Sequence, residues 1–452
     1  EPGLTRQDGL EIARRMVESG QVDFLNIIRG HMDTDAALRR VIPIHGMPAA
    51  PHLDFAGEVR EATRFPVFHA ARIQDVATAR HAIAAGKLDM VGMTRAHIAD
   101  PHIGRLLLEG QESDIRPCVG ATYCLDRIYE GNDAVCVHNA ATGREAAMPH
   151  VITRSEGPRR KVVVVGAGPG GLEAARVAAE RGHDVVLLEA ADRAGGQVLL
   201  ACRSPRRKEL IGIIDWRMQR LASHGVTLRF SKYAEAEDVV AETPDVVFLA
   251  TGGLPNTDVL QSGGELVAST WDVLSGAVTP AQRVLVYDDN GAHPAMQAAE
   301  MLAEAGSVVE IVTPERQFAP EIGGLNHAAY AEIFHRHGVR ITINARLVSV
   351  RRSGNALIAT IGSDHGPEQF ERPCDQVIVE HGTLPAADLY NALRPLSRNL
   401  AAVDYDALLA NRPQGMVRNP GGAFQLFRIG DAVASRNIHA AVYDALRLAK
   451  DI

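Results

Sequence analysis

Short apolar runs alternate with helical stretches over the first 110 residues. Three runs predict strands, at residues 22–28, 65–70 and 88–93. A stretch of helical character precedes each of them, at residues 9–20, 55–63 and 76–85. Brief links between these elements predict βα units that share a parallel sheet. Three units are too few to close an eight-stranded βα barrel, which needs about 250 residues. Residues 1–115 are therefore expected to form the last part of such a barrel.

The rest of the chain is also of α/β type. Four consecutive valines, Val162–Val165, predict a parallel strand that is buried on both faces. A similar strand is expected at residues 284–287, and the last residues, up to Ile452, predict an amphipathic helix. We interpret these features as two Rossmann-like dinucleotide folds, one inserted in the other. The outer fold is assigned to residues 161–265 and 386–452, the inner fold to 266–385, and a linker to 116–160.

Composition and charge exclude some partners. The 452 residues carry 47 Lys and Arg against 55 Asp and Glu, which gives a net charge of −8 without a long run of one sign. Nucleic acids and anionic membranes bind clustered basic faces, so neither is expected as a partner. No run of 18 apolar residues predicts a membrane span, and no leader peptide is recognised, so a cytoplasmic location is expected.

A glycine-rich motif follows the valine strand directly. Gly166, Gly168 and Gly171 fit the pattern G-x-G-x-x-G, and a helix and a second strand that ends in Glu189 come next. The first glycine permits a tight turn, the second lets the backbone approach a pyrophosphate, and the third allows close helix packing. Glu189 is placed to accept a hydrogen bond from a ribose 2′-OH. The alternative is a glycine-rich turn without a ligand.

Three further segments resemble the FAD-binding halves of flavoproteins that contain two dinucleotide folds. They are residues 195–197, 248–253 and 429–432, which supply Gly196, Gln197, Thr251, Gly252, Gly430 and Asp431. In that group of proteins the last aspartate reaches the ribityl chain. The resemblance implies that the outer fold binds FAD, or its ADP portion alone.

The inner fold lacks such a loop. After the strand at 284–287 the chain reads Asp288-Asp289-Asn290-Gly291-Ala292-His293-Pro294. Two carboxylates stand where a pyrophosphate needs backbone N–H groups and a positive field, which disfavours NAD(P). Alternatively, Asp288 and Asp289 cap the next helix, expected at 295–305. Both interpretations disfavour a nicotinamide nucleotide.

Three of the five cysteines lie close together in the sequence. Cys118, Cys124 and Cys136 fall in the linker, and thiolates at such spacing suit an iron–sulfur centre. Zinc is the rival, although neither a second C-x-x-C nor a histidine pair follows. Cys202 and Cys374 are expected to be buried small apolar residues.

The linker and the glycine motif together resemble one family of proteins. Residues 116–124, 136–143 and 162–171 are similar to the cluster-to-flavin junction of the trimethylamine dehydrogenase and 2,4-dienoyl-CoA reductase family. The resemblance covers the whole chain, including residues 24–31 and 92–101. It implies an FMN barrel, a 4Fe-4S cluster and two dinucleotide folds. Ala121 replaces one of four family cysteines, so the remaining three would hold a 4Fe-4S cluster with another fourth ligand, a 3Fe-4S cluster, or no cluster.

The resemblance also assigns residues in the barrel. The FMN phosphate would lie against Ala71 and Arg72 after one strand and Thr94 and Arg95 after the next. Backbone N–H groups and guanidinium groups at strand ends suit a phosphate. Surface arginines in ion pairs are the alternative. Five preceding βα units, which carry the isoalloxazine contacts in the family, would be absent.

Catalytic candidates lie at the end of the first predicted strand. Asn26 aligns with an active-site aspartate of the family, which leaves its role open. Arg29 could hold a substrate carboxylate bidentately, and His31 could position or deprotonate an amine.

The resemblance implies the oxidative demethylation of an N-methyl amino acid, N-methylproline above all, to the amine and formaldehyde. FMN would accept the hydride, and the cluster would pass electrons singly to an external acceptor such as an electron-transfer flavoprotein. One alternative is an NAD(P)H-dependent enoyl or dienoyl reductase of the same architecture. Another is an inactive fragment that binds FAD or ADP. The sequence leaves a homo-oligomer open.

Overall fold

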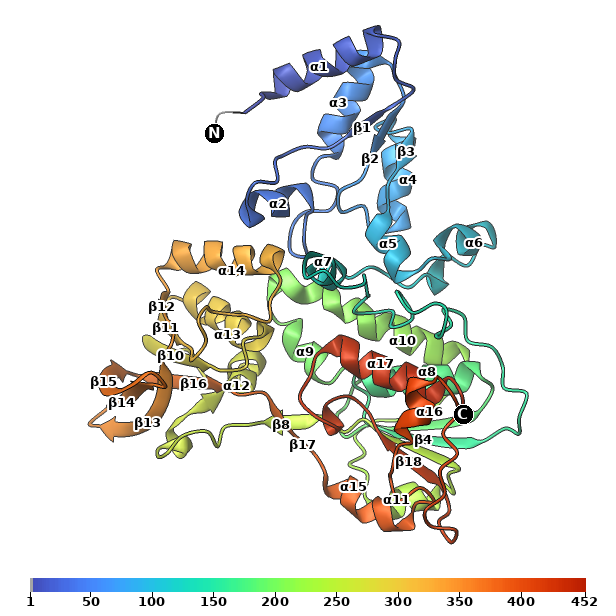
Figure 1. Cartoon of the computed structure of the whole chain (residues 1–452), viewed down its shortest axis with the longest axis vertical. Coiled ribbons are helices and arrows are strands. Elements are labelled where there is room, and N and C mark those ends of the chain that lie inside the picture. The colour runs from blue at the N-terminus through green and yellow to red at the C-terminus, as the bar shows by residue number, and fades with distance from the viewer. Residues whose placement is uncertain (1–2) are drawn as a thin grey trace. The chain divides into compact units, whose positions relative to one another are not determined.

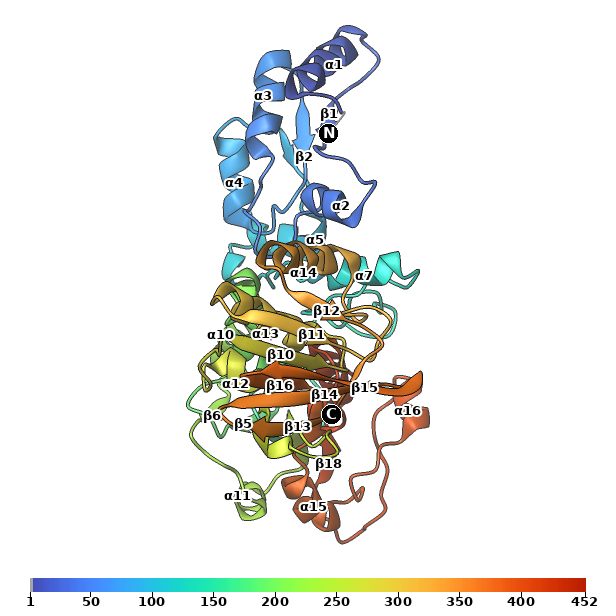
Figure 2. The same ribbon diagram turned by 90° about the vertical axis from the view of Figure 1, so that its left-hand side faces the viewer.

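The computed structural model describes residues 3–452, and the chain forms two compact units that meet in sequence between Thr122 and Tyr123. Both units are of α/β type, as Figures 1 and 2 show. Each is described by itself.

The first unit contains a three-stranded parallel sheet in the order β1-β2-β3. Its strands are β1 (Leu25–Ile27), β2 (Val67–His69) and β3 (Met90–Val91). They are shorter than the apolar runs that predicted them, because only the residues opposite a neighbouring strand form ladder hydrogen bonds. The helices are α1 (Arg6–Glu18), α2 (Asp35–Val41), α3 (Leu53–Thr63), α4 (Val76–Ala84), α5 (Thr94–Ala99), α6 (Ile103–Leu108) and η1 (Glu112–Asp114).

Local sequence explains where these helices begin. Thr5 and Asp8 form a capping box at the start of α1, and the Asp75 side chain accepts from the N–H of Thr78 at the start of α4. The helices bury their apolar faces on the sheet, where Ala56 and Val67 are completely inaccessible. The predicted βα units of this region are therefore confirmed as three parallel strands with helices between them.

The outer sheet of the second unit contains five parallel strands in the order β18-β7-β4-β5-β6. They are β4 (Lys161–Val165), β5 (Asp184–Leu188), β6 (Thr227–Arg229), β7 (Val246–Leu249) and β18 (Gln425–Arg428). Since β18 comes from near the end of the chain, the inner sheet lies within the connection between β7 and β18. Three long helices cover one another and the sheet: α8 (Pro169–Glu180), α10 (Gly212–Ser223) and α17 (Ile438–Ala449).

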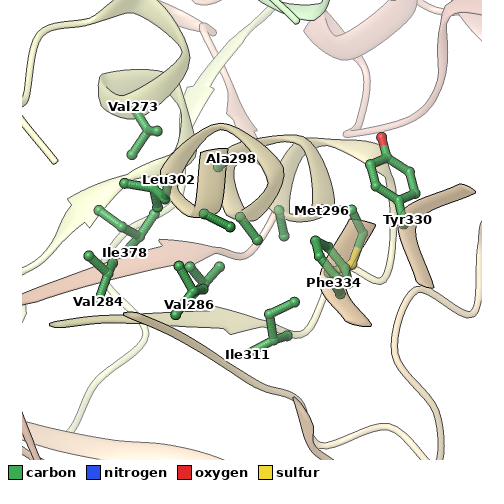
Figure 3. Close-up of a cluster of buried hydrophobic side chains, with 14 of the residues drawn as sticks. Val273, Val284, Val286, Met296, Ala298, Leu302, Ile311, Tyr330, Phe334 and Ile378 are labelled. Carbon is green, nitrogen blue, oxygen red and sulfur yellow. The ribbon is translucent and has the colours of Figure 1, made fainter. Parts of the chain in front are cut away.

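The inner sheet is also parallel and has the order β12-β11-β10-β16-β9. Its strands are β9 (Ala268–Ser269), β10 (Arg283–Asp288), β11 (Val308–Val312), β12 (Arg340–Thr342) and β16 (Gln376–Glu380). Its helices are α12 (Thr270–Ser275), α13 (His293–Glu304) and α14 (Gly324–His337). Figure 3 shows the core between α13 and this sheet, where Val286, Leu302 and Ile378 are fully buried.

Two smaller sheets complete the second unit. An antiparallel sheet, which the sequence patterns did not predict, consists of β13 (Arg346–Ser353), β14 (Ala356–Ser363) and β15 (Gly366–Cys374). The antiparallel pair β8 (Gly253–Pro255) and β17 (Thr383–Pro385) lies where the chain enters and leaves the inner fold.

The remaining helices are short: α7 (Tyr123–Tyr129), α9 (Gln197–Ala201), η2 (Pro205–Ile211), α11 (Ala236–Ala241), η3 (Gly264–Leu266), α15 (Asp388–Leu393), η4 (Arg394–Leu396), α16 (Tyr405–Leu409) and η5 (Gly430–Ala432). Within residues 3–452, none of the helices has both the length and the apolar character needed to cross a bilayer.

Candidate functional site

The glycine loop after β4 is closely packed. Gly166 has a φ of +101°, and a Cβ atom there would lie 2.3 Å from the carbonyl oxygen of Ala250. At Gly171 a Cβ would lie 1.9 Å from the carbonyl oxygen of Gly166. Neither position can hold a larger residue without movement of the backbone. The first and third glycines therefore shape the turn and the approach of helix α8, as their spacing predicts.

Gly168 has a different surrounding. It is the N-cap of α8, no side chain caps that helix end, and Pro169 occupies its first turn. A Cβ at Gly168 would meet no atom of the described residues within 4 Å. The N-terminus of a 12-residue helix therefore faces open space over a glycine, which is the arrangement that binds the phosphates of a dinucleotide. The loop fits the ADP portion of FAD.

Glu189 follows the end of β5 beside this loop. One oxygen of its carboxylate accepts the N–H of Ala167 at 2.6 Å, and the other accepts the N–H of Ala191 at 2.8 Å. These hydrogen bonds hold the carboxylate against the loop. A carboxylate has further lone pairs, so it can still accept from a ribose hydroxyl.

The structure brings several predicted flavin-site residues together. The side-chain amide of Gln197 donates to Asp431 at 2.9 Å, and a Cβ on Gly196 would lie 3.2 Å from the Cα of Gly168. Thr383, which sequence reasoning missed, donates to the same carboxylate of Asp431 at 3.3 Å. No motif singles out Thr383, because it belongs to the chain that returns from the inner fold.

The other two predicted segments, residues 248–253 and 429–432, lie at the ends of β7 and β18, which are neighbours in the outer sheet. Thr251 donates through its hydroxyl to the carbonyl of Ala386 at 3.0 Å, and Gly252 has a φ of +69°. Gly430 has a φ of +62°, and its N–H donates to the carboxylate of Asp444 at 3.2 Å.

The loop of the inner fold is occupied by its own carboxylate. Asp288 is the last residue of β10 and is fully buried; one oxygen accepts the N–H groups of Asn290 at 3.1 Å and Gly291 at 3.0 Å. The expectation that Asp288 and Asp289 cap the next helix is wrong, because Ala292 is the N-cap of α13 and has no side-chain acceptor. Asp288 instead binds the backbone donors that a phosphate would need.

A second buried carboxylate lies opposite. Glu380 ends β16 in register with Asp288; it accepts from Asn290 at 3.0 Å and from the hydroxyl of Thr270. Burial raises the pKa of Asp288 to about 7 and also raises the pKa of Glu380. Asp289 contacts His381. Sequence reasoning missed Glu380. The signal that could have found it is an apolar strand followed by an acidic residue, the same pattern by which β5 leads to Glu189. This loop does not fit a nicotinamide nucleotide.

The predicted phosphate site of the first unit lies at two adjacent strand ends. Ala71 and Arg72, after β2, both have positive φ values, +132° and +53°. Such backbone conformations are uncommon outside glycine and concentrate at functional sites. Thr94 and Arg95 open α5, just after β3, which pairs with β2.

Arg72 is buried, and its Nε donates to the carbonyl of Met47 at 2.8 Å. The alternative of a surface arginine in an ion pair is therefore wrong for this residue.

The catalytic candidates lie on and after β1 and are exposed. Asn26 is the middle residue of β1, in register with Phe68. The guanidinium carbon of Arg29 lies 5.6 Å from the centre of the Phe55 ring, which favours one orientation of an otherwise mobile side chain. His31 bonds through Nδ1 to Asp33, and this hydrogen bond lowers the pKa of Asp33.

Within residues 3–452, none of the five cysteines takes part in a disulfide. Cys118 lies in the first unit, where the Gln74 side-chain amide donates to its sulfur at 3.1 Å. Cys124 and Cys136 are buried in the second unit, and the N–H of His138 donates to the sulfur of Cys136 at 3.3 Å. Such N–H···S bonds are typical of thiolates that hold a metal cluster. Across residues 3–452, no three His, Cys, Asp or Glu side chains are grouped so that they could hold a metal ion.

The linker contains the helix α7, which carries Cys124 and is too short to show a period in sequence. One expectation about cysteines needs correction. Cys374 is buried as expected, whereas Cys202 is only half-buried. Burial raises the pKa of both thiols, that of Cys374 to about 11.

Known proteins resemble the chain over its whole length. It is 60% identical over 450 residues to "Probable N-methylproline demethylase" of Rhizobium meliloti, which covers 100% of this chain and 66% of that protein. It is 44% identical over 461 residues to "N,N-dimethylglycine/sarcosine dehydrogenase" of Chromohalobacter salexigens, covering 99% of this chain and 66% of the relative. The chain thus spans about two thirds of the length of these curated relatives.

Solved structures and a family model agree with these similarities. The structure of 2-naphthoyl-CoA reductase with 2-naphthoyl-CoA has a TM-score of 0.84 and 25% identity, and the match covers 100% of this chain and 63% of that one. The sequence model for pyridine nucleotide-disulphide oxidoreductases matches residues 160–406. The resemblance to the trimethylamine dehydrogenase and 2,4-dienoyl-CoA reductase family is confirmed by the sequence relatives. The chain therefore belongs to the pyridine nucleotide-disulphide oxidoreductase family.

Proposed function

We propose that the protein is an iron–sulfur flavoprotein that oxidatively demethylates an N-methyl amino acid, with N-methylproline as the first substrate to test. The 60% identity to a probable N-methylproline demethylase carries the proposal. The 44% identity to a dimethylglycine and sarcosine dehydrogenase favours the same substrate class, because these are also N-methylated amino acids.

The end of β1 would bind the substrate. Arg29 presents a planar guanidinium that can pair with a carboxylate through two hydrogen bonds. His31 is held by Asp33 and can orient the amine or accept its proton, since an imidazole titrates near neutral pH. Asn26 can donate a hydrogen bond from the same strand. These roles require an amino acid rather than a simple amine.

The proposed cofactor sites are distributed over both units of the chain. Ala71, Arg72, Thr94 and Arg95 would hold the FMN phosphate in the part of the barrel that this chain supplies. The glycine loop, with Asp431 nearby, would hold FAD or ADP. Cys124 and Cys136 would bind an iron–sulfur centre; that Cys118 joins them stays a prediction from spacing.

When bound, a flavin would supply hydride acceptance from the N-methyl carbon, and the iron–sulfur centre would supply one-electron transfer. In the overall reaction the substrate loses two electrons and water adds to the oxidised carbon, so that the amine and formaldehyde are released. The two electrons leave to an external acceptor such as an electron-transfer flavoprotein. The occupied loop at Asp288 supports this direction over reduction by NAD(P)H.

The test is an anaerobic absorption spectrum of the protein with N-methylproline added, followed by a formaldehyde assay with an artificial electron acceptor. Two results are expected: the flavin is bleached, and about one molecule of formaldehyde is released for every two electrons that the acceptor takes up. Titration with NADPH serves as the comparison. Bleaching by NADPH but not by N-methylproline would replace this proposal by a reductase.

A further inference from the structure

The short helix α9 borders the proposed dinucleotide site on one side. Its N-cap, Gly196, packs on the glycine loop, where a Cβ would lie 3.2 Å from the Cα of Gly168. Its first residue, Gln197, donates to Asp431 at 2.9 Å. The position of α9 therefore fixes how Gln197 and Asp431 lie relative to the glycine loop.

The inner fold holds the other end of this helix. A helix of five residues is not stable by itself, and the last carbonyls of a helix have no partner within it. Gln297, on α13, donates through Nε2 to the carbonyls of Ala201 at 2.8 Å and Leu200 at 3.4 Å. Its Oε1 accepts from Nη1 of Arg207 at 3.1 Å. Gln297 is 1% exposed, so water has little access to replace these hydrogen bonds.

The two folds cap each other's helices. Arg203, directly after α9, donates from Nε to the carbonyl of Leu274 at 3.3 Å and from Nη2 to that of Ser275 at 3.2 Å. These carbonyls belong to the last two residues of α12, a helix of the inner fold. Glu300, one turn after Gln297 on α13, binds Arg206 of η2 through two hydrogen bonds of 3.0 Å.

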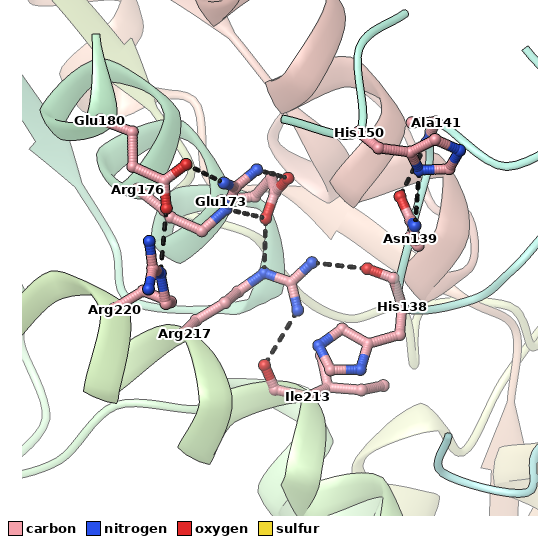
Figure 4. A network of polar contacts seen from close by, with 10 residues as sticks. All are labelled: His138, Asn139, Ala141, His150, Glu173, Arg176, Glu180, Ile213, Arg217 and Arg220. Atoms are coloured by element: carbon pink, nitrogen blue, oxygen red, sulfur yellow. Dashed lines mark hydrogen bonds and ion pairs between the residues drawn. The ribbon is translucent and has the colours of Figure 1, made fainter. Parts of the chain in front are cut away.

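Helix α8, on the other side of the site, is held within the outer fold, as Figure 4 shows. Glu173 on α8 accepts from Arg176 of the same helix at 2.7 Å and from Nε of Arg217 on α10 at 2.8 Å. Their side chains are 3% exposed or less. Loss of a contact to the inner fold should therefore move α9 and leave α8 in place.

Asp431 receives a second donor from the chain that leaves the inner fold. The hydroxyl of Thr383, in β17, lies 3.3 Å from the same carboxylate oxygen that accepts from Gln197. Strand β17 follows β16 of the inner sheet. Both of these donors to Asp431 thus depend on where the inner fold lies.

We propose that Gln297 is a positioning residue for the dinucleotide site of the outer fold. It holds the end of α9, so that Gly196 stays against the glycine loop and Gln197 stays on Asp431. The inner fold, whose own loop is occupied by Asp288, thereby supports the binding of adenine flavin in the outer fold. This inference rests on the proposed function, which supplies the flavin.

Gln297→Leu tests the proposal, because leucine has a similar volume and forms no side-chain hydrogen bond. The carbonyl of Ala201 and Nη1 of Arg207 each lose a buried partner in this variant. The loss of one such hydrogen bond changes an equilibrium constant about tenfold.

Amide hydrogen exchange reports on α9 without any ligand. The N–H of Cys202 donates to the carbonyl of Val198 at 2.9 Å, and that of Arg203 donates to the carbonyl of Leu200 at 3.0 Å. Exchange at these two amides is expected to rise about tenfold in Gln297→Leu. Equal rates in the wild type and the variant would overturn the positioning role.

Release of the nucleotide is the readout at the site. The purified protein with its bound flavin is diluted, the FAD that leaves is followed by its fluorescence, and chromatography of the released nucleotide separates FAD from ADP. Release is expected to be about tenfold faster in Gln297→Leu. A faster amide exchange with unaltered release would show that α9 does not support the site, and would overturn the proposal.

Glu300→Gln is the matched control. Glu300 lies on the same face of α13 as Gln297, but its printed partner is Arg206 of η2 and not α9. Its melting temperature should fall, whereas nucleotide release and exchange in α9 should stay at the wild-type values. Equally fast release in both variants would mean a general loosening of the two folds and would refute a specific role of Gln297.

Gln297→Glu separates the two contacts of the amide and serves if the leucine variant does not fold. Glutamate keeps an acceptor for Arg207 but has no donor for the carbonyls of α9, so release and exchange should rise as in Gln297→Leu. Wild-type values in Gln297→Glu would overturn the capping role. A wild-type protein that holds neither FAD nor ADP would refute the adenine-flavin part of the proposed function, and the exchange rates would then decide whether Gln297 positions α9.

Discussion

Replacing Asp288 by asparagine should make the protein more stable at pH 8 and flatten the dependence of its stability on pH. The wild-type carboxyl is fully buried, its Oδ2 has no hydrogen-bond partner among residues 3–452, and Glu380 lies opposite in the neighbouring strand. Burial, helped by the charge of Glu380, raises the pKa of Asp288 from 3.8 to about 7. Asparagine has the same shape and keeps an oxygen for the N–H groups of Asn290 and Gly291, but it has no charge.

The sign and size follow from linkage between ionisation and folding. Because the pKa is higher in the folded protein than in the unfolded chain, the stabilising contribution is complete below about pH 4. It is lost as the pH rises to about 7. One pH unit between the two pKa values is worth about 1.4 kcal/mol, so the buried charge costs the folded state about 4 kcal/mol at pH 8. The unpaired amide N–H of asparagine costs about 1–3 kcal/mol, which leaves a net gain of roughly 1–3 kcal/mol.

The assay is urea unfolding of both proteins at pH 5 and pH 8, with the free energy of unfolding compared at each pH. Glu380, whose pKa is also raised, should leave a smaller pH dependence in the variant. Asp364→Asn is the control, because this exposed carboxylate has a pKa that Arg346 lowers, and its loss should not stabilise the protein at pH 8. An Asp288→Asn protein that is less stable than the wild type at pH 8 would refute the reasoning.

Other substitutions test the binding sites. Gly171→Ala should abolish retention of adenine flavin and lower the melting temperature, because its Cβ would lie 1.9 Å from the oxygen of Gly166; flavin content and thermal unfolding measure both effects. Gly168→Ala meets no protein atom, so it should weaken flavin binding at least tenfold without a change in melting temperature, and unaltered binding would contradict the site. Arg29→Met should raise KM for N-methylproline about tenfold to hundredfold, the value of a charge-assisted hydrogen bond, while exposed Arg15→Met should leave KM unchanged. An unaltered KM in Arg29→Met would exclude its role.

Features that depend on neighbouring residues in the chain were predictable. The phosphate site is formed by one βα turn and one helix. Its whole pattern therefore lies within about 25 residues: the valine run of β4, the glycines after it and the strand that leads to Glu189. The three strands of the first unit were recognised for the same reason, although their ends were not. Strand ends depend on which residues of another strand lie opposite, and no local pattern records that.

Features that depend on distant pairing were not predictable. Asp288 and Glu380 are 92 residues apart, and only the register of β10 with β16 places them opposite each other. Arg217 reads as an ordinary polar residue in an amphipathic helix, but α10 packs against α8 and the Cys136 segment on that face. The antiparallel sheet was missed because its third strand, β15, is largely exposed and lacks an apolar face.

The two dinucleotide folds differ in the space that they leave for a phosphate because of a single strand end. In the outer fold β4 stops at Val165, Gly166 turns at φ +101°, and the start of α8 opens on free space above Gly168. In the inner fold β10 continues to Asp288, whose carboxylate takes the backbone N–H groups that a phosphate would otherwise bind. This internal carboxylate provides a hydrogen-bond acceptor for the N–H groups of the loop, so the loop needs no ligand in order to fold. The inner fold can therefore serve as a scaffold from which Thr383 reaches Asp431, while its loop offers no free backbone donors at Asn290 and Gly291.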